Sequence, residues 1–384
     1  MTDVNHHVDA SSNRVIRAAA PATVSGIFTD LDLQALRLLL LGGSVVDWRR
    51  LSFREPGEVA QFLAANGYDV ENSIEMDRLS ALHGRALQYL EETYELSIPD
   101  RVRTPKDVTE LFLTASGVNA DQDEQQAACA VLKVIHVLNH LEARRLVHHL
   151  SLSERALFLA AANKVDALIG EMQSAGFGIA EYEPSTKTDH SLITKLISKP
   201  RVTAAQIFDK LRFRLITESR EDLLPVIQWL LRQLFPFNHV IAGESHNTIL
   251  TEEELRDCLA PHLEHPDGDP SAHFGGYQPS NPATSPSFRM INFVVDLPVR
   301  INRLCTPAEL VRLSHLGHLV HVTLEFQLFD KATVLANEAG EGNHGAYKQR
   351  QLNLVSERLW GGLKPRLTAR DQVSRQVFDD SDAG

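Results

Sequence analysis

The chain has 384 residues, of which 43% are hydrophobic and 23% charged, and its formal net charge is −12. This length predicts two or three domains with ample core. The acidic balance argues against broad non-specific DNA binding, which needs a basic surface. No apolar run is long enough to span a bilayer, so no membrane insertion is expected.

The start of the chain lacks the features of a secretory signal. Residues 1–24 have no basic start followed by an apolar run and are expected to form a flexible lead. The three cysteines, Cys129, Cys258 and Cys305, are far apart and odd in number. This usage is typical of reduced thiols, not of a disulfide framework or a zinc cluster, and predicts a cytoplasmic protein.

Helical periodicity dominates residues 25–175, which are predicted to form a helical domain. The segments with helix start and stop signals are 30–43, 56–69, 73–94, 104–117, 123–150 and 151–176. Within them, His136 and His140 stand four residues apart, a spacing that a zinc-binding pair can have. No glutamate directly follows His136 and no third ligand is obvious, so a packing or surface role is the preferred interpretation.

Strands and helices alternate after about residue 180. Residues 211–217 alternate in polarity, 219–236 form an amphipathic helix, and 237–243 look like a strand. A long loop rich in Pro, Gly, Ser and Asn is expected at 262–286, followed by strands at 288–301 and 318–329. This order predicts an α+β fold with a mixed sheet in residues 180–360, followed by a tail at 361–384.

The strand at 318–329 carries a carboxylate and an amide on one face. Its alternation places Glu325 and Gln327 on the same side, about 7 Å apart. On a concave and partly dry face, Glu325 could hold Mg²⁺ or act as a base. A strand whose polar residues simply face water gives the same pattern.

Two basic segments could contact phosphates. Lys187, Ser191 and Lys195 are spaced by four, which predicts one helix face with two ammonium groups flanking a hydroxyl. Arg212 and Arg214 project from one side of the strand at 211–217. An ordinary basic surface stripe is the alternative for the first segment, and a surface ion pair is the alternative for the second.

Two further features complete the candidate site. Asp209 directly precedes the strand with the two arginines, a plausible place for a metal-binding carboxylate. His344, Tyr347 and Lys348 have helical i, i+3 and i+4 spacing after a glycine-rich stretch. A loose C-terminal helix is the alternative for this last group.

Taken in order, these segments resemble the synthetase domain of the RelA/SpoT family of alarmone synthetases. The matching family patterns are Lys-x-x-x-Ser-x-x-x-Lys, the Asp and Arg of Asp-x-x-Gly-x-Arg, Glu-x-Gln, and Glu-x-Gly followed by His-x-x-Tyr-Lys. The last pattern is matched by Glu338, Gly340, His344, Tyr347 and Lys348. The resemblance covers about residues 180–350.

The resemblance implies a nucleotidyltransferase-like fold and transfer of the β,γ-pyrophosphate of ATP to a 3′-hydroxyl. The acceptor is usually GDP or GTP, and some toxin relatives use adenine nucleotides or tRNA. It implies that Asp209 and Glu325 are catalytic and hold Mg²⁺. The implied ATP or phosphate contacts are Lys187, Ser191, Lys195, Arg212, Arg214, His344 and Lys348. The implied acceptor contacts are Gln327, Phe288, Asn292 and Tyr347.

The sequence departs from the family pattern at several positions. Ser185 replaces an Arg, Arg212 replaces the Gly of Asp-x-x-Gly-x-Arg, and Phe329 replaces an Arg. Phe288 and Asn292 align with the Tyr and His of the family's Tyr-x-Ser-x-His strand. Phe can still stack on a base. The N-terminal region has no His-Asp pair, which argues against alarmone hydrolysis.

The sequence therefore predicts a pyrophosphokinase that uses Mg²⁺, ATP and a nucleotide or tRNA acceptor. A catalytically degenerate nucleotide- or RNA-binding module on the same fold is the alternative. The helical domain is expected to bind a protein partner or to regulate the other half of the chain.

Overall fold

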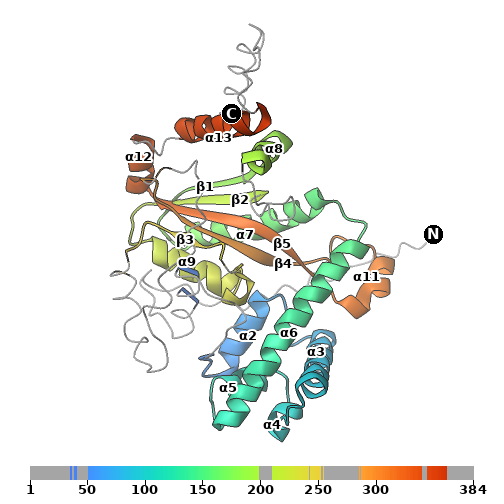
Figure 1. Cartoon of the computed structure of the whole chain (residues 1–384). Helices are drawn as coiled ribbons and strands as arrows, with labels where there is room; N and C mark the ends of the chain where they lie inside the picture. Colours follow the sequence, from blue (N-terminus) through green and yellow to red (C-terminus); the bar gives the residue numbers. More distant parts are fainter. Residues whose placement is uncertain are drawn as a thin grey trace, which may run out of the picture.

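The computed structural model describes residues 35–36, 39–40, 51–198, 210–241, 243–251, 254, 285, 287–339 and 344–360 (Figure 1). The predicted lead and tail, nearly all of the predicted helix at 30–43 and nearly all of the predicted loop at 262–286 lie outside these residues. None of the described helices has the length and apolar character that crossing a bilayer demands.

Long helices occupy the first half of the described chain. Their bounds are α2 (Pro56–Ala65), α3 (Ser73–Tyr94), α4 (Asp100–Arg103), α5 (Glu110–Ala115), α6 (Gln122–His149) and α7 (Glu154–Ser174). Side-chain caps fix where the longest ones begin: Asn72 caps α3, Asp121 forms a capping box with Glu124 at α6, and Ser153 caps α7. Of the predicted helix at 104–117, only residues 110–115 are α-helical.

A five-stranded mixed sheet confirms the predicted α+β class. Its strands are β1 (Ile179–Thr186), β2 (Leu211–Thr217), β3 (His246–Asn247), β4 (Ile291–Arg300) and β5 (Leu319–Asp330). The order across the sheet is β1-β2-β5-β4-β3, and the β2–β5 pair is parallel whereas the other pairs are antiparallel. The sequence did not predict β1, because this edge strand contains Pro184 and has mostly exposed residues.

One face of the sheet is apolar and covered by two helices. Phe213 and Phe326 are fully buried on it, and Phe235, which follows α9 (Leu223–Gln233), packs on Phe326 with ring centroids 5.2 Å apart. The ring of Tyr182 stacks on Phe213, and its hydroxyl donates to Asp166 of α7 at 2.5 Å. The opposite face, which carries the odd-numbered side chains of β5, is therefore the face left for chemistry.

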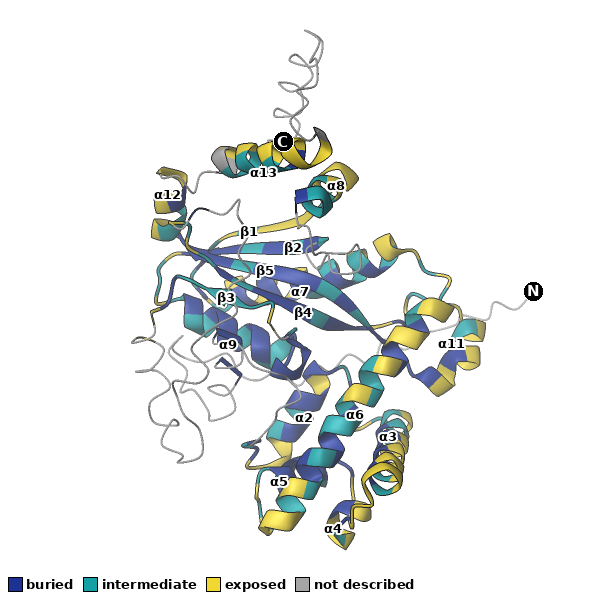
Figure 2. Ribbon diagram, in the orientation of Figure 1, coloured by how far each residue is buried: buried dark blue, intermediate teal, exposed yellow. Residues whose placement is uncertain are grey.

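The hydrophobic core is continuous between the two halves of the chain. A single cluster of buried side chains extends from Ala35 to Phe329, and α7 packs against the sheet (Figure 2). Phe62 of α2 also packs on Phe237 beyond α9. The predicted boundary between residues 175 and 180 does not separate two cores, and the division into domains stays a prediction.

The connections around the sheet differ from the expected strand at 237–243. Residues Phe237–His239 form a 3-10 helix, η2, because Pro236 precedes them and its carbonyl accepts from the His239 amide at 2.9 Å. Val240 then makes an isolated bridge to Val295. The remaining elements are α8 (Asp189–Ser198), α11 (Pro307–Leu313), η5 (Ser314–Leu316), α12 (Lys331–Ala339) and α13 (His344–Trp360).

Candidate functional site

One side chain from each of the five strands meets its register partner on the polar face of the sheet. These residues, which we call the polar row, are His246, Asn292, Gln327, Arg214 and Glu183. Neighbouring strands lie about 4.8 Å apart, so the row crosses the whole sheet as a line of polar groups. Two of the four sequence segments, the arginine strand and the Glu-x-Gln strand, are thereby brought side by side.

Glu325 lies beside this row and is almost fully buried, with 7% of its surface exposed. It is the register partner of Arg212 across the parallel β2–β5 pair. The Nε of Arg212 donates to Glu325 Oε2 at 2.6 Å, a charge-assisted hydrogen bond. A water-facing strand is therefore the wrong interpretation for Glu325.

The second carboxylate oxygen of Glu325 also has donors. With its amide nitrogen turned toward β5, as its hydrogen-bonding partners require, Asn292 donates to Glu325 Oε1 at 2.8 Å and to the Phe326 carbonyl at 3.1 Å. Gln327 Nε2 lies 3.4 Å from the same Oε1. Three neighbouring strands thus hold the carboxylate in one orientation, which is the preorganisation that charge stabilisation requires.

An aromatic surface adjoins the row. The guanidinium of Arg214 lies over the Phe329 ring, 5.3 Å from its centroid, and Phe288 meets the same ring edge-on at 6.2 Å. Phe288 is partly exposed whereas Phe329 is buried. The aromatic residue at 329 therefore positions Arg214, and Phe288 offers a ring that a base could contact.

The predicted basic helix is only partly formed as expected. Helix α8 begins at Asp189, so Ser191 and Lys195 share one helix face but Lys187 precedes the helix. The Lys187 amide donates to the Lys210 carbonyl at 3.0 Å, which continues the β1–β2 pairing by one step. Lys187 is thereby fixed at the entry of the strand that carries Arg212. The Ser191 hydroxyl is 3.1 Å from that of Thr188 and is exposed.

Helix α13 places the last predicted segment beside α8 (Figure 1). It begins at His344 and carries Tyr347 and Lys348, both partly exposed. Gln351 lies 3.4 Å from the Ser198 hydroxyl, and Arg358 donates to the carbonyl of Ile197. The two cationic segments therefore lie on neighbouring helices, although they are far apart in the sequence.

Asp209 lies outside the described residues. The predicted sharing of one Mg²⁺ between Asp209 and Glu325 therefore stays a prediction. Mg²⁺ is usually bound by one or two carboxylates together with substrate phosphates. Glu325 fits the role of one such ligand chemically, but its Oε2 is engaged by Arg212.

Sequence reasoning missed His246. Its strand, β3, has two residues, which is too short for an alternation signal. The register places His246 beside Asn292, the position at which the resembled family has histidine. Burial lowers the pKa of His246, so its ring is neutral near pH 7.

A hollow of ≈520 Å³ lies elsewhere, at the carboxyl ends of β2 and β5. Its wall residues are Glu218, Ser219, Arg220, Asp330, Ala332, Thr333 and Ala336. Glu218 is paired with Lys331 at 2.5 Å, and Asp330 accepts from the Thr333 hydroxyl at 2.6 Å. None of the site residues predicted from the sequence lines this hollow, so the polar row is the stronger candidate for chemistry.

No protein-family model matches the chain, and no curated protein matches it. Several solved structures do. The small alarmone synthetase 1 from Bacillus subtilis is 11% identical, with 60% of this chain and 95% of that chain covered and a TM-score of 0.30. The small alarmone synthetase 2 from the same organism is also 11% identical, with 59% of this chain and 94% of that chain covered and a TM-score of 0.30.

A GTP pyrophosphokinase family protein from Streptococcus pneumoniae is also similar. It is 12% identical, with 59% of this chain and 90% of that chain covered and a TM-score of 0.29. These likenesses are distant. The function proposed below rests on the residues of this chain and on their positions in the sheet.

Proposed function

We propose that the polar face of the sheet is the site of a pyrophosphokinase, which transfers the pyrophosphate of ATP to a 3′-hydroxyl of a nucleotide or RNA. The supporting observation is the register of β2 and β5, which pairs Arg212 with Glu325 and Arg214 with Gln327. Two of the sequence segments that resemble the RelA/SpoT synthetase pattern include residues of this pair of strands, and the other two include residues of α8, which follows β1, and of α13, which packs on α8.

The chemistry of the residues suits this transfer. Pyrophosphoryl transfer depends mainly on positioning and on neutralising phosphate charge. Lys187, Lys195 and Arg214 would supply cationic contacts to the ATP phosphates, and Phe288 would stack on the acceptor base. Glu325, with Asp209, would hold Mg²⁺, which supplies charge neutralisation at the transferred group when bound.

A second candidate function is nucleotide binding without turnover. The specific observation in its favour is the Arg212–Glu325 ion pair at 2.6 Å, which occupies the carboxylate proposed to hold Mg²⁺. The resembled family has glycine at position 212. If the guanidinium stays in place when ATP binds, the site would bind phosphates but lack its metal ligand.

Transfer of the γ-phosphate label tests the proposal. Purified protein is incubated with Mg²⁺, ATP labelled at the γ-phosphate, and GDP, GTP, AMP, ADP or tRNA in turn, and the products are identified by mass spectrometry. A labelled acceptor carrying two added phosphates supports the pyrophosphokinase. Folded protein that binds ATP by calorimetry but labels none of these acceptors would support the second function instead.

Arg212→Gly separates the two candidates by the sign of its effect. If Arg212 leaves Glu325 to contact phosphate during turnover, the variant should lose activity about tenfold, the equivalent of one charge-assisted hydrogen bond. If Arg212 blocks the carboxylate, the variant should gain activity over a silent wild type. Arg212→Lys, which keeps the charge, is the matched control.

A further inference from the structure

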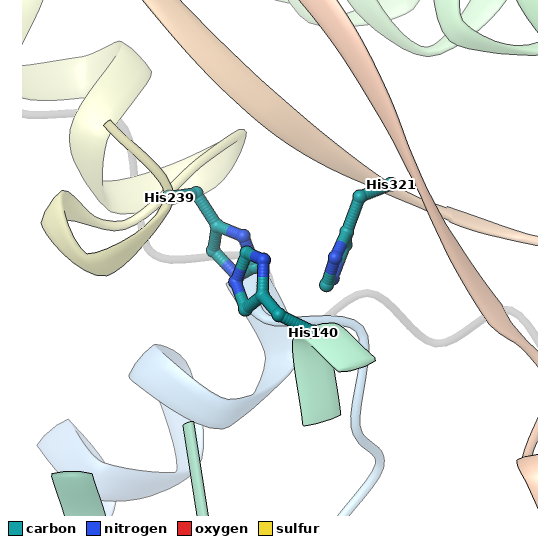
Figure 3. A group of neighbouring side chains, drawn as sticks. All are labelled: His140, His239 and His321. Carbon is teal, nitrogen blue, oxygen red and sulfur yellow. The ribbon is translucent and has the colours of Figure 1, made fainter. Parts of the chain in front are cut away.

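Three histidine rings meet on the face of β5 that carries Glu325, toward the start of that strand and away from the polar row (Figure 3). His140 comes from α6, His239 from η2 and His321 from β5, and each offers a ring nitrogen within 4.8 Å of the other two. The ring centroids lie 4.1 Å apart for His140 and His321 and 5.0 Å apart for His239 and His321. We call this group the histidine cluster.

One nitrogen of each ring is buried without a hydrogen-bond partner. These atoms are His140 Nε2, His239 Nδ1 and His321 Nε2. His239 is 2% exposed. Buried polar atoms nearly always have a partner, so three orphans in one place indicate a missing ligand.

The outer nitrogen of His239 is oriented by a hydrogen bond, and that of His140 faces a carboxylate. His239 Nε2 lies 2.8 Å from Asn66 Oδ1, which can only accept, so Nε2 carries the proton and Nδ1 presents a lone pair to the cluster. His140 Nδ1 faces Asp296 Oδ2 at 3.9 Å, and Asp296 Oδ1 accepts from the Thr323 hydroxyl at 2.6 Å. Metal-binding histidines characteristically have such oxygen partners on the outer nitrogen.

We propose that His140, His239 and His321 bind one divalent transition-metal ion of the zinc class. Three neutral imidazoles suit Zn²⁺ at bonds of about 2.0 Å, which place the nitrogens about 3.3 Å apart in a tetrahedral site. The ring nitrogens, which lie within 4.8 Å of one another, would approach to that separation around the ion. The side chain of His140 is 25% exposed, which leaves a route to solvent and a position for a fourth ligand.

The charges around the cluster permit a cation. Asp296 supplies a carboxylate behind His140. Burial lowers the pKa of Lys164, whose ammonium donates to the Pro298 carbonyl, to about 8. The lowered pKa makes Lys164 easier to deprotonate beside a bound cation than an exposed lysine.

The ion would join three elements that are distant in the sequence. It would tie α6 of the helical half to β5, four residues before Glu325 on the same face of that strand. This site is distinct from the proposed Mg²⁺ ligands, because imidazole nitrogens favour zinc whereas carboxylates favour magnesium. It is a structural link, and it stands or falls independently of nucleotide transfer.

Metal analysis tests the site directly. Protein is expressed with a histidine-free tag, stripped with a chelator, reloaded with Zn²⁺ and dialysed, and its metal is measured by mass spectrometry. We expect about one zinc per chain in the wild type and at least a tenfold lower content in His140→Gln and His321→Gln. His148→Gln, an exposed histidine on the same helix α6, is the matched control and should retain zinc.

X-ray absorption of the zinc-loaded wild type keeps the proposal falsifiable if the variants do not fold. Three imidazole nitrogens at about 2.0 Å support it, and fewer than three overturn it. Failure of the wild type to retain zinc, or equal retention by His140→Gln and His321→Gln, would also overturn it. None of these measurements involves ATP, so their outcome is separate from that of the transfer assay.

Discussion

The two ends of the polar face of β5 differ in how their polar groups are satisfied. At one end, Glu325 accepts from donors on β2, β4 and β5. At the other, His321 meets His140 and His239 with one orphan nitrogen on each ring. The first end is complete within the protein, and its fixed carboxylate suits the proposed transfer. The second is incomplete and calls for an ion.

The helical half of the chain packs on both faces of the sheet. The histidine cluster uses α6, and the apolar face of the sheet is covered by α7. Removing residues 1–175 to test a regulatory role would take both helices away and expose the sheet. Point substitutions are therefore preferable, and the following ones test the roles proposed for Glu325 and for the histidine cluster.

The largest effect is expected from Glu325→Gln. The substitution keeps the shape but removes the charge that would hold Mg²⁺, so transfer to the acceptor should fall at least about 100-fold. Thermal unfolding should confirm that the variant is folded. Glu181→Gln, an exposed carboxylate on β1, is the control and should keep full activity. Equal rates for Glu325→Gln and the wild type would remove Glu325 from the mechanism.

Low pH should lower the stability of the fold through the histidine cluster. Burial lowers the pKa of His136 from 6.5 to about 3 and also lowers those of His140, His239 and His321. The unfolded chain therefore binds more protons than the folded one below pH 6.5. Stability is full above pH 6.5 and falls as the pH drops toward the folded pKa values, by up to about 1.4 kcal/mol per pH unit for each imidazole.

Urea unfolding of metal-free protein at pH 7.5, 6.5 and 5.5 measures this slope. His321→Gln should flatten it, and His148→Gln, which alters an exposed ring, should not. Lys164 contributes little in this range, because it is mostly protonated in both states below its folded pKa of about 8. An identical slope in all three proteins would show that the cluster does not titrate on unfolding.

Much of the arrangement around Glu325 was predictable from the sequence. Alternation alone places Glu325 and Gln327 on one face, and the same rule groups Arg212 with Arg214. The pairing of these two strands was not predictable, because register depends on the whole sheet. The orientation of Asn292 toward Glu325 and the position of His246 follow from that register, so they appeared only in the structure.

The second end was not predictable at all. The sequence shows His136 and His140 as a helical pair, and a helix-packing or surface role was the preferred interpretation. The structure places His140 against His239 and His321, which come from η2 and β5. No local spacing relates ligands from three separate elements. The strand β1 was not predicted for a different reason. Its Pro184 and exposed carboxylates are not typical of a strand in the sequence.

A moderate effect is expected from Phe288→Ala beside the polar row. If Phe288 stacks on the acceptor base, its loss should raise the acceptor KM about tenfold, within the usual range for base–aromatic stacking. Phe288→Tyr should keep the wild-type value because it retains the ring. The KM for ATP is the internal control and should not change. An equal rise in both KM values would indicate a general disturbance of the sheet.

The smallest effect should come from the residue that joins the two ends. Thr323 lies between His321 and Glu325 on β5, and its hydroxyl donates to Asp296, which faces His140. Thr323→Val keeps the shape but leaves Asp296 without this donor, so stability should fall by about 1 kcal/mol in urea unfolding. Zinc affinity should weaken because Asp296 no longer orients His140. The transfer rate should hold, since Glu325 keeps its own three donors. A loss of activity without a loss of zinc would mean that Thr323 serves the polar row instead.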